Sequence, residues 1–281
     1  TILGMLYRNE TSDDLLAQLK AILKVSRVLS ENGDKVLDLT GLRWASPLQI
    51  LPLAVLVKQN NLTFTYPRNA DCDSYLKFIG FPAGKRVVTV GNNYIPILEF
   101  PTKTEDKIIS NDPDSQLFHL FSDYVGAKPN SLGWIANSIS EMVDNIQQHA
   151  KVSSAYILAQ FYPGKKFLDI CILDTGISIP GSYEAHGVEF ETDGEAIKKA
   201  LSGVSTRREG GRGKGLPTTM EAVSNLFGGK ALVMSRKGVA VIEPKMKINI
   251  LDSTVGWQGT LLLLRIPVQT RDLPDLYTVL D

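Results

Sequence analysis

Apolar residues along the first hundred positions change repeatedly between helical and strand spacing. They recur every three or four positions from Leu15 to Leu29, directly after a polar run in which Ser12 or Asp13 can cap a helix. The segments that follow alternate in the same way, with strands expected at 35–39, 62–66 and 94–100 and helices at 47–57 and 73–79. Helices that alternate with strands over so short a length predict a small α/β layer.

A polar stretch then divides the chain. Residues 101–115 are mostly Thr, Lys, Glu, Asp, Asn and Pro, with one apolar pair, Ile108 and Ile109, and this composition is typical of a linker. We therefore expect a first domain over 1–100, a linker over 101–115, a second domain over 116–268 and a C-terminal tail over 269–281. The length of 281 residues agrees with about two domains.

The second half combines a long helical pattern with several strand patterns. An apolar stripe that contains Ile135, Ile139 and Ile146 predicts a long helix, which Asn130-Ser131 can cap. Residues 176–215 form a long, glycine-rich and largely irregular connection with a short helix near 195–201. The remaining elements are expected as helices at 116–124 and 217–226 and strands at 155–162, 167–173 and 259–267. The predicted fold class of the whole chain is α/β (α+β).

Charge and composition narrow the function classes. The chain carries 30 Lys and Arg against 30 Asp and Glu, so it lacks the overall positive field of general nucleic-acid and membrane-surface binders. No apolar run approaches the roughly 20 residues that span a bilayer, and the first residues do not read as a secretion signal. Cys72 and Cys171 lie far apart, which argues against a disulfide framework or a cysteine zinc site. We expect a cytoplasmic protein that binds neither nucleic acid nor membrane.

Two polar residues stand four positions apart on the expected long helix. Glu141 and Asn145 therefore project from one face. An amide oxygen is a ligand suited to Mg²⁺, and a carboxylate one turn away can accept a proton from a water or hydroxyl that attacks a phosphate. On spacing alone, the pair fits a solvated helix face better than a metal and phosphate site.

A carboxylate and a glycine follow the strand expected at 167–173. Asp174 can accept a hydrogen bond from an exocyclic amine such as that of adenine, and Gly176 lets a flat base approach the backbone. The same Asp-x-Gly pattern is also that of an ordinary turn.

A third motif is the glycine-rich run at 209–216, which leads into the helix expected at 217–226. Backbone N–H groups of such glycines at a helix N-terminus can bind an anion. The Walker A pattern fails because Lys214 is followed by Gly215, and the dinucleotide fingerprint fails on its strand and its spacing. The run by itself fits either a structural loop or a phosphate site.

In this order, the three motifs resemble those of the GHKL ATP-binding domains, which include gyrase, mismatch-repair ATPases and histidine kinases. Residues 141–150, Glu-Met-Val-Asp-Asn-Ile-Gln-Gln-His-Ala, look like the N-box, and residues 174–180, Asp-Thr-Gly-Ile-Ser-Ile-Pro, look like the first glycine box. Residues 211–216, Gly-Arg-Gly-Lys-Gly-Leu, resemble the second glycine box, and residues 259–267 resemble the closing Gly-Thr strand. The resemblance covers 116–268 and implies a two-layer α/β sandwich with a mixed sheet and a glycine-rich ATP lid over 177–212.

The resemblance also implies roles for single residues. Asn145 would hold Mg²⁺, with Glu141 as general base and as a second contact to the metal through water. Asp174 would bind the adenine amine beside Gly176, with support from Thr260. Further nucleotide-binding candidates are Ile179 and Leu216 in the boxes, the phosphate-binding Gly211, Gly213 and Gly215, and the basic Arg207, Arg212 and Lys214, which would face the triphosphate or form a solvated loop. Position 141 holds Glu, and in this the chain resembles the GHKL ATPases and the anti-sigma-factor serine kinases, which carry Glu at the corresponding place.

The first half resembles a STAS domain of the anti-sigma-factor-antagonist type. The resemblance is carried by Val36-Leu-Asp-Leu-Thr-Gly-Leu-Arg-Trp-Ala-Ser46, by 62–65 and by 75–81. Pro47 and Leu48 occupy the two places where that family has serines, which argues against phosphorylation of this half, and Ser46 is the nearest hydroxyl. A generic α/β module is the alternative.

Two functions follow from these resemblances. In the first, the protein binds Mg-ATP and hydrolyses it or transfers its γ-phosphate to a hydroxyl of a partner protein. In the second, ATP only orders the lid, and the protein is a non-catalytic switch that captures or releases a protein partner. In both, the STAS-like half would choose the partner, and a homodimer is compatible with either.

Overall fold

The computed structural model describes residues 14–32, 35–85, 93–101, 128–149, 154–206, 215–268 and 272–276. The expected linker beyond Pro101, the expected helix at 116–124 and the expected caps Ser12 and Asp13 lie outside these residues. In the part that is described, no helix is both long and apolar enough to cross a membrane.

The described residues of the first half form three helices and two short strands, in the order α1 (Leu15–Asn32), β1 (Val36–Asp38), α2 (Pro47–Gln59), β2 (Thr63–Thr65) and α3 (Ala70–Phe78). The predicted alternation of helix and strand is confirmed. Asp14 stands directly before α1, and its Oδ1 accepts the backbone N–H groups of Leu16 and Ala17. The structure therefore gives the N-terminal hydrogen bonds of α1 to Asp14 and corrects the expectation of Ser12 or Asp13.

Helix α2 is buried along almost its whole length, which explains why its sequence is apolar on every side. Ser46 caps its N-terminus and Pro47 follows in the first turn, where a missing N–H costs little. The Ser46 hydroxyl also donates to Gln18 Oε1 at 2.6 Å, and the residue has no exposed surface. A kinase cannot reach this hydroxyl in the folded chain.

In the residues that the structure describes, the second half contains five strands of one sheet and four α-helices. Its elements are β3 (Tyr94–Pro101), α5 (Pro129–His149), β4 (Ser154–Tyr162), β5 (Phe167–Asp174), α6 (Ser178–Ala185), α7 (Asp193–Leu201), α8 (Gly215–Glu221), β6 (Lys230–Glu243) and β7 (Lys247–Pro267). A π-helical turn, Ala222–Leu226, extends α8. Helix α5 begins at Pro129, so Asn130-Ser131 lie in its first turn and do not precede it as caps. The region 176–215 is more regular than expected because it holds α6 as well as α7.

The large sheet has the strand order β3-β4-β5-β7-β6, and each of its four pairings is antiparallel. The expectation of a mixed sheet is therefore wrong for the described strands. Parallel pairing occurs between β1 and β2, which form a separate two-stranded sheet. Strand β3 also corrects the expected boundary at residue 100, because it pairs with β4 and so belongs to the sheet of the second half.

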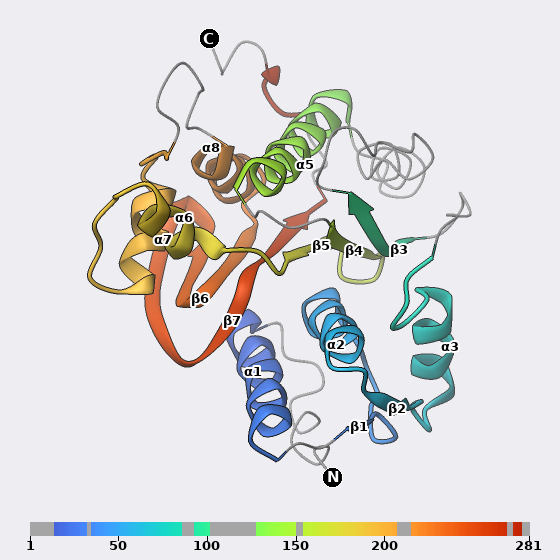
Figure 1. Ribbon diagram of the computed structural model, residues 1–281. Coiled ribbons are helices and arrows are strands. Elements are labelled where there is room, and N and C mark those ends of the chain that lie inside the picture. Colours follow the sequence, from blue (N-terminus) through green and yellow to red (C-terminus); the bar gives the residue numbers. More distant parts are fainter. Residues whose placement is uncertain are drawn as a thin grey trace.

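Both faces of the large sheet are covered, which makes three layers where two were expected (Figure 1). Helices α5, α7 and α8 pack on one face, and α1 and α2 of the first half pack on the other. Side chains of a strand alternate between faces, so Ile172 lies in the core under α5 while Leu173 lies in the core with α1 and α2. The mixed α/β class is confirmed, and the first half forms the third layer.

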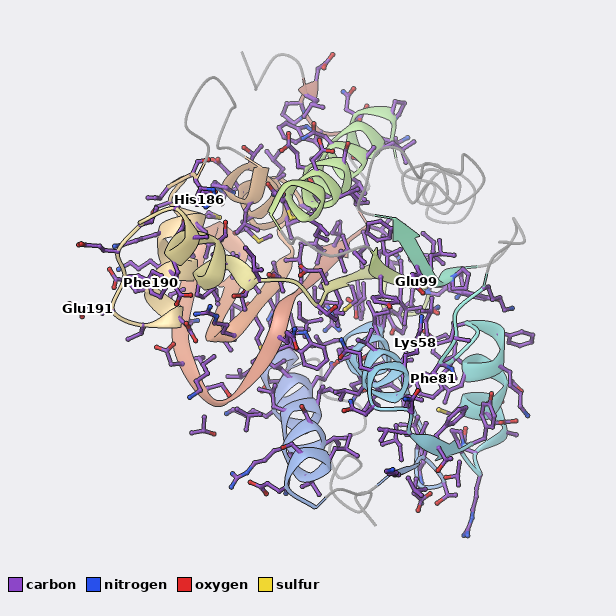
Figure 2. The ribbon with its side chains drawn as sticks, viewed as in Figure 1. Lys58, Phe81, Glu99, His186, Phe190 and Glu191 are labelled. Carbon is purple, nitrogen blue, oxygen red and sulfur yellow. The ribbon has the colours of Figure 1, made fainter. Side chains whose placement is uncertain are left out.

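Polar contacts join the same two halves at the β3 edge. Lys58 of α2 pairs with Glu99 of β3 at 2.6 Å, and Figure 2 shows these side chains together. The Tyr156 hydroxyl of β4 donates to the other oxygen of Glu99 at 3.2 Å, and the Lys58 ammonium lies 4.8 Å from the Tyr156 ring centre. These partly exposed contacts fix orientation more than they add stability.

Candidate functional site

A row of three side chains across the middle of the large sheet forms the floor of the site. Ile172 of β5 pairs with Leu262 of β7, and Leu262 pairs with Val233 of β6. All three lie in the core on the α5 face, whereas Leu173 and Leu261 lie in the core on the other face. Strands β5, β7 and β6 thus offer an apolar surface to a ligand on the α5 side.

Asp174 stands at the end of this floor as the last residue of β5, and it is 3% exposed. Its Oδ1 accepts the backbone N–H of Gly176 at 2.8 Å. Burial raises the pKa of Asp174 to about 6, although hydrogen bonds from the backbone N–H groups of Gly176 and Thr260 act in the opposite direction. In its ionised form this carboxylate is a strong acceptor for a ligand N–H group.

Thr260 reaches the same place from β7 because the backbone before it lies against Asp174. Gly259 has φ +87°, and a Cβ there would collide with the carbonyl oxygen of Asp174. Both the left-handed conformation and the close approach require glycine at this position. The Gly-Thr pair thus brings the backbone N–H of Thr260 to the Asp174 carboxyl, and both residues line one cavity.

Glu141 and Asn145 stand one turn apart on α5, and both meet Gly215 at the start of α8. A Cβ on Gly215 would lie 2.7 Å from Glu141 Oε2 and 2.9 Å from Asn145 Nδ2. The absence of a side chain on Gly215 therefore allows α8 to approach the two polar groups. The expectation that Glu141 and Asn145 share one helix face agrees with this geometry.

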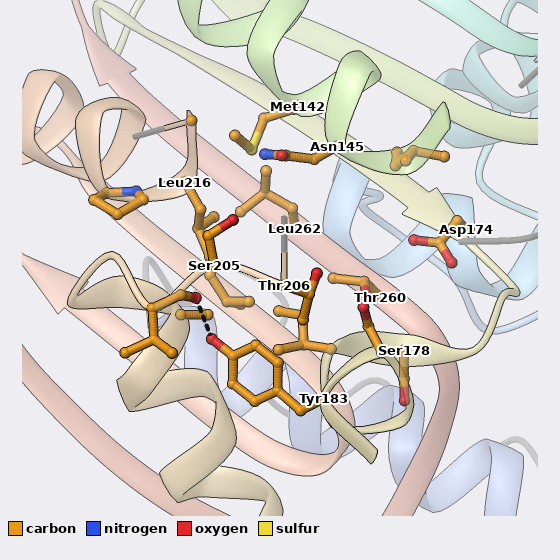
Figure 3. A pocket seen from close by; sticks show the side chains of 18 of the residues that line it. Met142, Asn145, Asp174, Ser178, Tyr183, Ser205, Thr206, Leu216, Thr260 and Leu262 are labelled. Carbon is orange, nitrogen blue, oxygen red and sulfur yellow. Dashed lines mark hydrogen bonds between the residues drawn. The ribbon is translucent and has the colours of Figure 1, made fainter. Parts of the chain in front are cut away.

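A cavity of about 160 Å³ joins these two polar clusters over the apolar floor. A single buried water needs roughly 10–15 Å³, so the cavity accommodates a much larger ligand. Figure 3 shows Met142 and Asn145 from α5, Thr260 and Leu262 from β7, and Ser205 and Thr206 from the segment after α7 around this space. An apolar cavity with a few convergent polar groups and a residue of raised pKa is the usual form of a small-molecule site.

One wall of the cavity comes from α6, a helix that the sequence did not predict. Ile179, which was expected in the site, lines the cavity together with Ser182 and Tyr183, which were not expected. Their spacing of three and four positions is the signal of a helix face that could have revealed the helix. The Tyr183 hydroxyl donates to the carbonyl oxygen of Val204 at 2.6 Å. This bond fastens the segment after α7, which carries Ser205 and Thr206, to α6.

The structure thus gathers most of the expected site residues that it describes. Those lining the cavity are Asn145, Asp174, Ile179, Gly215, Leu216 and Thr260. Glu141 and Gly176 do not line it but contact residues that do. The expected phosphate-binding and basic residues Arg207, Gly211, Arg212, Gly213 and Lys214 lie outside the described residues.

The oxygen donors beside Gly215 fit a magnesium ion. Mg²⁺ takes few protein ligands and completes its shell with waters and substrate phosphates, and an amide with a neighbouring carboxylate is such a set. Asn145 would hold the ion through its amide oxygen, and Glu141 would reach it through a water. Among the described residues, no group of three or more His, Cys, Asp or Glu side chains is placed to hold a metal.

In comparisons with known proteins, no family model matches the chain, and no curated protein matches it.

Proposed function

We propose that this protein binds Mg-ATP in the cavity between α5 and the large sheet, and that it hydrolyses ATP or transfers the γ-phosphate to a hydroxyl of a partner protein. The observation that carries the proposal is the meeting of Glu141 and Asn145 at Gly215, at one cavity that also holds Asp174 and Thr260. A base-binding end and a phosphate-binding end are thereby joined by an apolar floor.

Each end has a defined task in this proposal. Asp174 accepts the exocyclic amine of adenine, and Ile172, Val233 and Leu262 pack against the ring. At the other end, Asn145 holds the magnesium ion, which shields phosphate charge when bound. Glu141 accepts the proton of the attacking water or hydroxyl, for which a carboxylate one helical turn from the metal ligand is suitably placed.

The experiment compares the full chain with the variant Glu141→Gln, using ATP labelled in the γ-phosphate. Free phosphate reports hydrolysis, and label on protein reports transfer. The substitution removes a proton acceptor while it keeps shape, so we expect turnover to fall by about 10²–10⁴-fold and the affinity for ATP to stay within a few fold. Asp144→Asn is the matched control, because Asp144 is an exposed acid on the same helix, and it should leave both quantities unchanged.

Equal phosphate release by the wild-type chain and Glu141→Gln would contradict the role of Glu141. Unchanged ATP binding in Asp174→Ala, measured by titration calorimetry, would contradict the assignment of the base-binding end.

A second candidate function is an ATP-controlled interaction switch without catalysis. Its support is the packing of α1 and α2 on the reverse face of β5 and β7, directly behind Asp174 and Thr260. A nucleotide bound on the α5 face of β5 and β7 would contact the same strands against which α1 and α2 pack on the opposite face. ATP binding without free phosphate or labelled protein would favour this function.

A further inference from the structure

Behind Thr260 lies a buried hydroxyl that the proposed function does not use. Ser235 of β6 pairs with Thr260 in the sheet and has no exposed surface. Its Oγ accepts the backbone N–H of Ile179 at 2.9 Å and lies 3.0 Å from the carbonyl oxygen of Gly259 and 3.1 Å from Thr260 Oγ1. The Ser235 hydroxyl thus contacts the backbone of β7 at Gly259, the first turn of α6 at Ile179 and the hydroxyl of Thr260, a residue that lines the cavity.

The donors and acceptors around Ser235 determine the direction of each of these hydrogen bonds. A serine hydroxyl has one proton and two acceptor lone pairs. The Ile179 N–H occupies one lone pair, and the Gly259 carbonyl can only accept, so it takes the Ser235 proton. The contact with Thr260 then needs a proton from Thr260, which fills the second lone pair of Ser235.

The consequence is that Thr260 turns its proton away from the cavity and offers acceptor lone pairs to a ligand. The neighbouring Asp174 carboxylate, when ionised, also has only acceptors. A ligand edge placed here must therefore donate. An exocyclic amine meets this requirement, whereas an oxo group at the same position sets an acceptor against two acceptors and leaves them unpaired, which is the costly case.

We propose that Ser235 is a positioning residue that orients the Thr260 hydroxyl, and that through Thr260 it makes this end of the cavity prefer a 6-aminopurine nucleotide over its 6-oxo analogue. The inference rests on the proposed nucleotide site. It adds a residue outside the cavity lining that sets base preference without touching the base.

The test compares the affinities of the full chain for ATP and for inosine triphosphate, whose purine carries an oxo group in place of the amine. In Ser235→Ala, the Thr260 hydroxyl is free to rotate and to donate to the oxo group. We expect the ratio of the two affinities, ATP over inosine triphosphate, to fall about 3- to 10-fold, which is the usual effect of one neutral hydrogen bond.

Ser224→Ala is a closely matched control. Ser224 is also buried, donates to the backbone carbonyl of Glu243 at 2.8 Å and accepts the backbone N–H of Met246 at 2.6 Å, but neither of these partners lines the cavity, whereas Thr260, the partner of Ser235, does. Ser224→Ala should therefore lose about as much stability as Ser235→Ala, while its ratio of the affinities for ATP and inosine triphosphate stays that of the wild type.

A double-mutant cycle with Thr260→Val tests whether Ser235 acts through Thr260. Valine keeps the shape of threonine and removes the hydroxyl, so adding Ser235→Ala should then change the affinity ratio no further. If Ser235→Ala does not fold, Ser235→Cys replaces it, because a thiol is a weak donor and acceptor, and the ratio should fall in the same direction.

An unchanged affinity ratio in both Ser235 variants would overturn the inference, and so would a change that persists in the Thr260→Val background. In either case ATP binding by the wild-type chain would leave the proposed function standing. A wild-type chain that binds neither nucleotide would overturn the proposed function and this inference with it.

Discussion

Replacing Asp174 with asparagine should stabilise the ligand-free protein while it weakens ATP binding at the proposed nucleotide site. The carboxyl is buried at the end of β5, and burial raises its pKa from the ordinary 3.8 to about 6. Ionising it at neutral pH therefore costs folding free energy. An asparagine has the same shape, keeps an oxygen to accept the Gly176 N–H, and carries no charge to desolvate.

The size of the effect follows from the shift of the pKa. A rise from 3.8 to about 6 is roughly two units, and each unit corresponds to about 1.36 kcal/mol, so the ionised carboxylate costs about 3 kcal/mol. The sign follows from proton binding. Between these two pKa values the folded chain binds more protons at Asp174 than the unfolded chain does, so the stability of the wild type falls as pH rises and levels off above about 6.

The assay is equilibrium denaturation by urea of wild type and Asp174→Asn in the absence of nucleotide, at pH 5 and pH 8. The variant should be more stable by about 1.5 kcal/mol at pH 5 and about 3 kcal/mol at pH 8. Asp144→Asn is the control at the surface, where substitutions usually change stability by less than about 0.5 kcal/mol.

A gap between wild type and Asp174→Asn that is equal at the two pH values would refute the reasoning, because it would show that ionisation of Asp174 does not set the difference. A variant less stable than the wild type at pH 8 would refute it as well. The affinity for ATP should meanwhile drop in the variant, which exchanges stability for function in the usual direction.

Two further substitutions test the supports of the site. Gly259→Ala should destabilise the protein by roughly 2–5 kcal/mol, because it places a side chain on a left-handed backbone and in collision with Asp174. The control Gly256→Ala should cost less than about 1 kcal/mol, because its Cβ would find no atom closer than 3.6 Å. Denaturation midpoints measure both changes in stability. Asp169→Asn should cost about 3–5 kcal/mol, because it leaves the buried Arg265 guanidinium, now 2.7 and 2.8 Å from the two carboxylate oxygens, without its counter-charge. Glu31→Gln breaks an exposed ion pair on α1 and should leave the melting temperature unchanged; an equal loss in both acid variants would contradict the argument from burial.

Local patterns predicted the elements well because each is encoded within a few neighbouring residues. The stripe between Leu15 and Leu29 gave α1, and Asp174 was expected at the end of a strand, where it lies. The pairing of β3 could not be predicted, because a strand pattern carries no information about its neighbour in the sheet. One feature of the sequence did indicate that both faces of the sheet are covered. The unbroken apolar run Leu261–Leu264 is typical of a strand that is buried on both sides.

The site was predicted where motifs hold their residues close in sequence and missed where the fold supplies them. The spacing of Glu141 and Asn145 is enough to place them on one helix face, and Gly259 and Thr260 are adjacent in the sequence and could be recognised as a motif. Ser235 gave no signal of its own, because the role proposed for it depends on its pairing with Thr260 in the neighbouring strand.

The third layer of the fold has a practical consequence for any attempt to express the second half by itself. A fragment that begins after residue 101 would lack β3, and so would expose the edge of β4. It would also present to solvent the sheet face that α1 and α2 now cover, which includes Leu158, Leu173, Leu261 and Leu263. A contiguous apolar surface of this kind promotes aggregation, so the first half acts as the built-in solubility partner of the second.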